Sequence, residues 1–139
     1  MIDGGLRNLF KSHLPRMHIQ PIESWGTGVG LPDFNYCFDG KEGWVECKVA
    51  TANAVTITPG QVSWAERRLR AGGRILLAVR RHAPAGPRRG AGYDELWLFP
   101  GCATRHVAIH GLLGYKPLGC WGDGPAAWDW PCVQKILLA

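Results

Sequence analysis

Long apolar runs and paired cysteines are both missing from this chain of 139 residues. Its apolar stretches fall far short of the roughly 20 residues that cross a bilayer, so we expect no membrane segment. The first residues, MIDGGLRNLFKSHLP, lack a basic segment followed by an apolar stretch and a cleavage site, which favours a cytoplasmic location. The five cysteines are odd in number and contain no C-x-x-C pair, which argues against a disulfide framework or a zinc ribbon.

Acidic residues are absent from residues 67–89, although this segment contains eight arginines. The net charge is +5, so the rest of the chain carries −3. Clustered arginines bind phosphates and release counterions, which favours a nucleic-acid partner, whereas a solvated basic surface is the alternative. Apolar residues make up 46% and charged residues 19%, as in a folded chain. We therefore expect a single domain over residues 1–139.

Periodicity predicts a helix over residues 4–14, with Asp3 as an N-cap and Pro15 at its end. A short strand over 19–25 should follow, then a hairpin of residues 34–38 and 44–49 around the turn DGKEG, residues 39–43. Thr58-Pro59-x-Gln61 matches a capping box and begins the clearest helix, which should end at Gly72.

Two strands should follow that helix, over residues 74–80 and 95–99, joined by an exposed loop in residues 82–94. The order helix, strand, hairpin, helix, strand, strand indicates an α/β fold, a mixed central sheet flanked by helices. Residues 100–139 give no clear pattern. The seven tryptophans are expected to pack in the core and at interfaces rather than to stack on bases.

Charged residues interrupt the second strand of the predicted hairpin. Glu46 and Lys48 lie two residues apart and share a face, whereas Cys47 points the other way. The hairpin should bring Asp33 beside Glu46. Two adjacent carboxylates favour a hard divalent cation, and Lys48 beside them can stabilise charge developing on a phosphate. A salt bridge on an exposed strand face is the simpler alternative.

Pro32-Asp33 followed by Glu46-Cys47-Lys48 resembles the PD-(D/E)xK nuclease signature. The segments GLPDF, WVECK and Pro59-x-Gln61-x-x-Trp64 are similar to the small stand-alone VRR-NUC nucleases and related phage enzymes, over roughly residues 3–80. The resemblance implies a restriction-endonuclease-like fold. It also implies a metal-dependent DNA endonuclease in the cytoplasm of a bacterium or of a phage's host.

The resemblance also implies residue roles. Asp33, Glu46 and the carbonyl of Cys47 would bind Mg²⁺ or Mn²⁺, Lys48 would assist the attacking water, and Gln61 would touch the site. The family's further acidic residue is either Glu23, which we favour, or Asp3. The capping box by itself also explains Gln61. Phosphate contacts are expected from seven arginines: Arg67, Arg68, Arg70, Arg80, Arg81, Arg88 and Arg89.

The implied substrate is branched DNA such as a Holliday junction in recombination, cut by a homodimer. Two alternatives remain: an inactive DNA-binding accessory protein that keeps the nuclease fold, and a restriction-type duplex nuclease. Elsewhere in the chain, Cys102-x-x-x-His106-x-x-x-His110 has helical spacing and, with Cys120, is a candidate for a zinc site that is weaker than the carboxylate pair.

Overall fold

The structure is a computed structural model that describes residues 3–23, 30–88 and 90–139. One sheet of six strands, in the order β1-β2-β3-β4-β5-β6, forms its centre. All neighbouring strands are antiparallel except β3 and β4, which are parallel. The elements are α1 (Leu6–His13), β1 (His18–Pro21), β2 (Phe34–Phe38), β3 (Lys41–Ala50), α2 (Pro59–Arg70), β4 (Ile75–Ala83), β5 (Tyr93–Pro100), α3 (Thr104–His110), β6 (Gly119–Trp121) and α4 (Trp130–Leu138).

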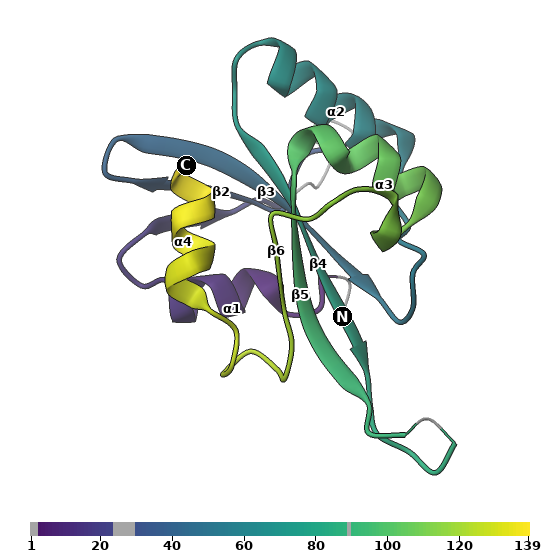
Figure 1. The fold of residues 1–139 in the computed structure, drawn as a ribbon. Helices are drawn as coiled ribbons and strands as arrows, with labels where there is room; N and C mark the ends of the chain where they lie inside the picture. The colour runs from purple at the N-terminus through teal and green to yellow at the C-terminus, as the bar shows by residue number, and fades with distance from the viewer. Residues whose placement is uncertain (1–2, 24–29, 89) are drawn as a thin grey trace.

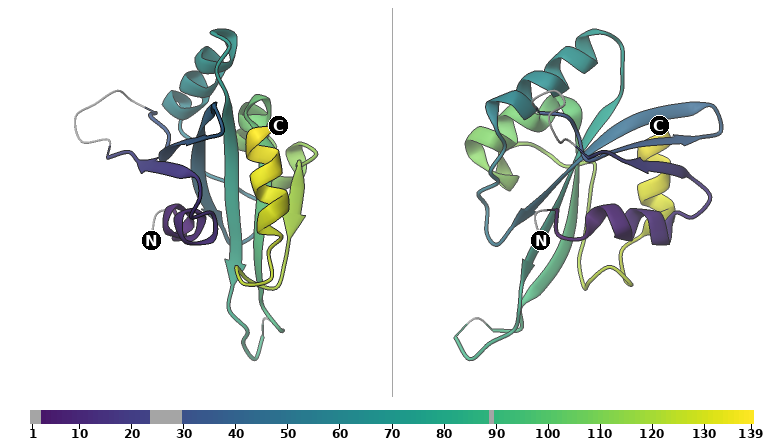
Figure 2. Two further views of the ribbon diagram at one scale, coloured as in Figure 1. Left: turned by 90° about the vertical axis from the view of Figure 1, so that its left-hand side faces the viewer. Right: turned by 180° about the vertical axis from the view of Figure 1, so that it is seen from behind.

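The expected α/β class and the order of the first elements are confirmed. Helices form two groups, α1 with α4 and α2 with α3 (Figure 1 and Figure 2). One core cluster joins α1 and α4 to the sheet through Phe10 and Val133, and a second joins α3 to the other face through Val107. Helix α2 makes the crossover between the parallel strands β3 and β4, as parallel pairing requires.

Strand β4 supplies apolar side chains to both faces. Leu76 and Ala78 lie in the cluster with α1 and α4, whereas Leu77 and Val79 lie in the cluster with α3. A strand covered on both faces has a continuous apolar sequence, which is why residues 74–80 were predictable. Strand β4 continues to Ala83 and β5 begins at Tyr93, so the loop that joins them is shorter than the predicted 82–94. The two strands extend beyond the body of the molecule as a hairpin (Figure 1).

The β2–β3 hairpin turns on Asp39 and Gly40 alone, both with positive φ, of 52° and 75°. Such a two-residue turn matches the twist of the flanking strands. The predicted turn over 39–43 was therefore too long, because residues 41–43 already belong to β3. The tight turn pairs Phe38 with Lys41 and Phe34 with Val45. One further step along each strand places Asp33 opposite Glu46.

The amino-terminal helix α1 is shorter than the predicted 4–14, and its N-cap residue is Gly5. Asp3 nevertheless serves the helix start, because its carboxylate accepts the backbone N–H of Gly5 at 3.0 Å and that of Arg7 at 3.4 Å. The predicted N-cap was thus misplaced by two residues. Strand β1 is also shorter than the predicted 19–25, and residues 24 and 25 lie outside the described residues.

The carboxy-terminal segment, which the sequence left unassigned, completes the core. Trp128 and Trp130 are buried, which confirms the packing role expected of the tryptophans in this part. The rings of Trp130 and Phe10 meet edge to face at 5.4 Å. Asp129 caps α4 by accepting the N–H of Cys132 at 3.0 Å. The hydroxyl of Tyr36, from β2, donates to a carbonyl of α4 at Leu137, so this helix is tied to the hairpin that carries the candidate site.

Candidate active site at the carboxylate pair

Asp33 is held between two strands at the edge of the hairpin. Its backbone N–H donates to the carbonyl of Val45 at 3.1 Å, and its own carbonyl accepts from Ile22 at 2.9 Å. Its side-chain Oδ2 accepts the N–H of Cys47 at 2.7 Å. With its backbone bonded on both sides and its carboxylate bonded to Cys47, Asp33 has little freedom to move. The structure therefore presents Asp33 to β3 in a defined position, directly at Glu46-Cys47-Lys48.

Glu46 is a buried carboxyl group, only 5% exposed, on the face of β3 opposite to Cys47. Its Oε1 has no hydrogen-bond partner within the described residues. Burial raises the pKa of Glu46 to about 9, and the Asp33 carboxyl contributes through a side-chain hydrogen bond and its charge, whereas Lys48 acts in the opposite direction. The structure thus brings together the two acids that the sequence paired, in surroundings that disfavour the ionised state.

Lys48 and Cys47 occupy opposite faces of β3. Lys48 is half-buried, and its positive charge acts to lower the pKa of Glu46, against the larger effect of burial. Cys47 points into the cluster with α1 and α4, and its burial raises the pKa of the thiol well above the usual value. The thiol is therefore a core group, and only the main-chain carbonyl of residue 47 remains as the predicted ligand.

The two candidates for a further acidic residue both contact Arg7 and not the carboxylate pair. The Nε of Arg7 lies 3.0 Å from Oδ2 of Asp3, and its terminal nitrogen lies 3.7 Å from Oε1 of Glu23. The side chain of Glu23 is 71% exposed. Burial alone raises the pKa of Asp3, but hydrogen bonds from Gly5 and Arg7 outweigh it and hold that pKa below its usual value.

The described residues contain no group of three or more His, Cys, Asp or Glu side chains able to hold a metal ion. Glu23 as a third acid remains a prediction: its side chain lies beside Arg7, on which the charge of Asp33 also acts. Two carboxylates and a carbonyl remain. This number suffices for Mg²⁺, which binds through one or two carboxylates and completes its shell with water and phosphate oxygens.

Gln61 takes part in a complete capping box. Its side-chain oxygen accepts the N–H of Thr58 at 2.9 Å, and its own N–H donates to the Thr58 hydroxyl at 3.2 Å. The start of α2 is also close to the segment that leads to Asp33, since a Cβ at Gly30 would overlap the carbonyl of Gly60. The structural role of Gln61 is thus visible, whereas its predicted contact with the site remains a prediction.

The predicted DNA-binding arginines divide into two groups. Arg80 binds Asp94 through two hydrogen bonds, of 2.8 and 2.7 Å, and donates to the carbonyl of Gly4 at 2.7 Å. Arg81 binds Glu95 at 3.0 Å. These two guanidinium groups are paired with acids of β5, so their contact with phosphate remains a prediction. The others among the described residues are exposed: Arg67, Arg68, Arg70 and Arg88. Arg89 lies outside the described residues.

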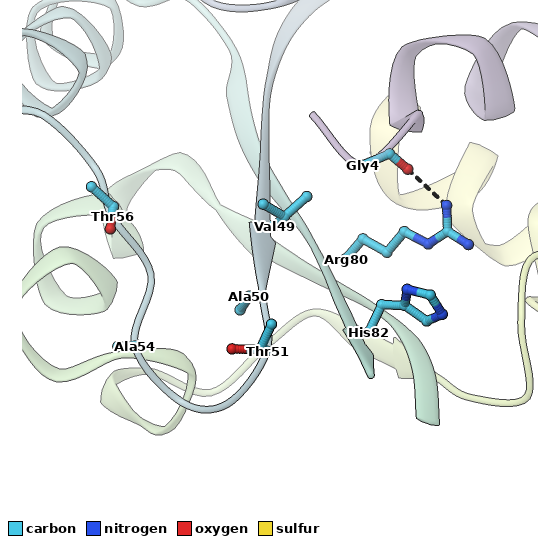
Figure 3. Close-up of a pocket in the computed structure, with 8 residues that line it drawn as sticks. All are labelled: Gly4, Val49, Ala50, Thr51, Ala54, Thr56, Arg80 and His82. Carbon is cyan, nitrogen blue, oxygen red and sulfur yellow. Dashed lines mark hydrogen bonds between the residues drawn. The ribbon is translucent and has the colours of Figure 1, made fainter. Parts of the chain in front are cut away.

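A pocket of about 530 Å³ lies beyond the end of β3, lined by Gly4, Val49, Ala50, Thr51, Ala54, Thr56, Arg80 and His82 (Figure 3). It includes none of Asp33, Glu46 and Lys48. Figure 3 shows the Arg80 guanidinium directed at Gly4, not into open space. This pocket is therefore distinct from the carboxylate pair.

The Cys102-His106-His110 pattern lies on helix α3 and the turn before it, as its spacing allows. The Sγ of Cys102 lies 3.5 Å from the hydroxyl of Tyr115, and the rings of Tyr115 and His106 lie 5.5 Å apart. Among the described residues, which include Cys102, His106, His110 and Cys120, no three His, Cys, Asp or Glu side chains are grouped so that they could hold a metal ion. The alternative of a zinc site thus has no support from the geometry.

No family model, curated protein or solved structure matches this chain. Within the described residues, no helix has the length and apolar character needed to span a bilayer. The functional argument therefore depends on the geometry of the carboxylate pair.

Proposed function

We propose that this protein is an endodeoxyribonuclease that hydrolyses phosphodiester bonds with Mg²⁺ or Mn²⁺. The observation that supports this most directly is the buried Oε1 of Glu46, which lacks a hydrogen-bond partner among the described residues while its carboxyl adjoins that of Asp33. An unpaired buried carboxylate is costly, and a divalent cation relieves both the desolvation and the mutual repulsion. Asp33, Glu46 and the carbonyl of Cys47 would hold the ion.

A bound divalent ion would supply positive charge against the phosphate oxygens and a fixed position for the attacked phosphodiester. The chain's own residues supply the rest. Asp33 and Glu46 orient the reacting groups, because both sit on paired strands with little freedom. Lys48, on the same face as Glu46, carries the ammonium that can stabilise the negative charge developing on the phosphate and orient the attacking water. In each of these roles, a charged side chain lies where charge develops during the reaction.

The proposed substrate is branched DNA, such as a four-way junction, cut by a homodimer. Support for a nucleic-acid substrate comes from the exposed arginines Arg67, Arg68 and Arg70, which lie on α2. This helix starts beside the segment that carries Asp33, as the close approach of Gly30 and Gly60 shows. Arginines at this position can bind the backbone of a DNA strand whose scissile phosphate lies at the carboxylate pair.

The experiment is a cleavage panel with Mg²⁺ on a four-way junction, a flap, single strands and linear duplex at equal concentration. Wild type is compared with Asp33→Asn, Glu46→Gln and Lys48→Ala, each expected to lose at least about 100-fold in cleavage rate. Glu66→Gln is the matched control, because this acid binds only Arg105 at the surface. Retained cleavage in all three site variants overturns the proposal. Preference for plain duplex overturns only the branched-DNA part.

One observation favours a second candidate, a DNA-binding protein with a nuclease-like site but no turnover. No third acidic side chain joins Asp33 and Glu46 among the described residues. Such a protein binds DNA with the same salt dependence, yet shows no cleavage with Mg²⁺ or Mn²⁺ on any substrate of the panel. The complete set of Asp33, Glu46 and Lys48 favours the enzyme.

A further inference from the structure

Two tryptophans and an arginine form a cluster on the face of the sheet that carries Glu46. Trp44 lies two residues before Glu46 in β3 and so shares its face. The ring of Trp44 meets that of Trp64, on α2, at 5.3 Å and 67°. The Cζ of Arg68 lies 4.6 Å from the Trp64 ring centre and 5.5 Å from that of Trp44. This group is named the Trp44–Trp64–Arg68 cluster below.

Both tryptophans of the cluster are only partly buried, unlike Trp128 and Trp130 in the core. Trp64 and Arg68 are four residues apart on α2, which places them on one side of the helix. The cluster therefore lines the surface between α2 and β3, next to the buried carboxylate of Glu46.

Arg68 is held in place without using its hydrogen-bond donors. Its aliphatic stem passes Gly73 so closely that a Cβ there would overlap Cδ of Arg68. Its side chain makes no hydrogen bond or ion pair within the described part of the chain, whereas five other arginines do: Arg7, Arg74, Arg80, Arg81 and Arg105. A guanidinium that lies over aromatic rings does not use its N–H groups as hydrogen-bond donors to them, so these N–H groups are free for a phosphate.

The position of the cluster sets which phosphate it can reach. Two residues of a β-strand span about 7 Å, so the backbone of Trp44 lies about that far from that of Glu46 along β3, and Arg68 contacts the ring of Trp44. Phosphates follow one another about every 3.4 Å along the axis of a duplex strand. The separation therefore corresponds to one or two nucleotides.

We infer that Arg68, oriented by Trp44 and Trp64, binds a backbone phosphate one or two nucleotides from the bond that lies at the carboxylate pair. This inference rests on the proposed nuclease function for the position of that bond. Arg68 is then a positioning residue that fixes the register of the strand. Arg67 has the same charge and is its neighbour on α2, yet no aromatic contact of Arg67 occurs among the described residues, so it offers the matched control.

The first test measures DNA binding without divalent ions, by fluorescence anisotropy over a series of salt concentrations. Arg68→Ala should lower the slope of log affinity against log salt by about 0.9 for duplex, or about 0.7 for a single strand, the value for one phosphate contact. Arg67→Ala is the control for the loss of one exposed positive charge from the same helix. Arg68→Lys keeps the charge but cannot stack as a plane, and should restore only part of the affinity. Thermal unfolding of each variant checks that the fold is kept.

The second test replaces single phosphates of the oligonucleotide by neutral methylphosphonates. Wild type should lose affinity when the neutral group lies one or two nucleotides from the cleaved bond, and Arg68→Ala should be insensitive to that replacement. An unchanged slope in Arg68→Ala, or a methylphosphonate pattern in Arg68→Ala that equals the pattern of wild type or of Arg67→Ala, overturns the inference. If DNA binding depends on Arg68 but no substrate is cleaved, the phosphate contact is supported and the nuclease function is overturned.

Discussion

Replacing Glu46 by glutamine should stabilise the metal-free protein, and increasingly so as the pH rises. The pKa of this carboxyl is raised from 4.5 to about 9 in the folded chain. Below pH 4.5 both the folded and the unfolded chain hold the proton, so the group has no effect. Between pH 4.5 and pH 9 only the unfolded chain releases it, and each pH unit lowers the free energy of unfolding by about 1.4 kcal/mol.

The loss accumulated at pH 7 is therefore about 3 kcal/mol, against a total stability of about 5–15 kcal/mol for a domain. Glutamine has the same shape and no charge at any pH, so Glu46→Gln removes this loss. The assay is urea denaturation in EDTA at pH 5, 6, 7 and 8. The difference in free energy of unfolding between the variant and wild type should grow by about 1.4 kcal/mol per unit.

Glu66→Gln is the control for this experiment. The hydrogen bond from Arg105 lowers the pKa of Glu66, so its contribution is complete above its ordinary pKa and does not change between pH 5 and pH 8. Mg²⁺ should restore stability to wild type but not to Glu46→Gln, because an ion that binds only the folded chain adds its binding free energy. Parallel pH profiles for wild type and Glu46→Gln would refute the reasoning, since they would mean that Glu46 is not buried beside Asp33.

Two smaller predictions concern the elements that position the site. Gly30→Ala should destabilise the chain and slow cleavage, because φ is +83° there and a Cβ would overlap the carbonyl of Gly60. Gly40 has φ +75° but open space around it, so Gly40→Ala should lower the free energy of unfolding, measured by urea denaturation, by about 1 kcal/mol and leave cleavage unchanged. Gln61→Ala should lower the free energy of unfolding by about 1 kcal/mol through the lost hydrogen bond to Thr58, and Gln61→Glu should restore it. Equal effects at the two glycines, or no restoration by Gln61→Glu, would contradict these assignments.

Local signals were sufficient for the part of the chain that carries the candidate site. The Thr58 capping box and the Asp39-Gly40 turn act through residues close in sequence, so their outcome hardly depends on the rest of the chain. A two-residue turn also determines the pairing of the strands that it joins. The hairpin that brings Asp33 to Glu46 was therefore predicted, whereas its exact register was not, because the predicted turn of residues 39–43 is in fact Asp39-Gly40 alone.

The uses of the charged side chains were not predictable in the same way. Arg80 was expected to bind phosphate, but it pairs with Asp94, which the antiparallel pairing of β4 and β5 brings next to it. Glu23 was expected at the site, but Arg7 of a different element lies beside it. A charged side chain pairs with the opposite charge that the fold places nearest to it. The sequence shows which residues are charged but not which of them become neighbours.

The sequence by itself determined the first two helices, the hairpin and the approach of two acids, because capping, turn signals and strand alternation act over a few residues. Only the tertiary structure decided that Glu46 is buried with an oxygen that has no partner among the described residues, that α4 packs with α1 in one core cluster, and that Arg68 lies over the rings of two tryptophans. Burial and stacking depend on segments far apart in the chain, and their free energies exist only once those segments have come together.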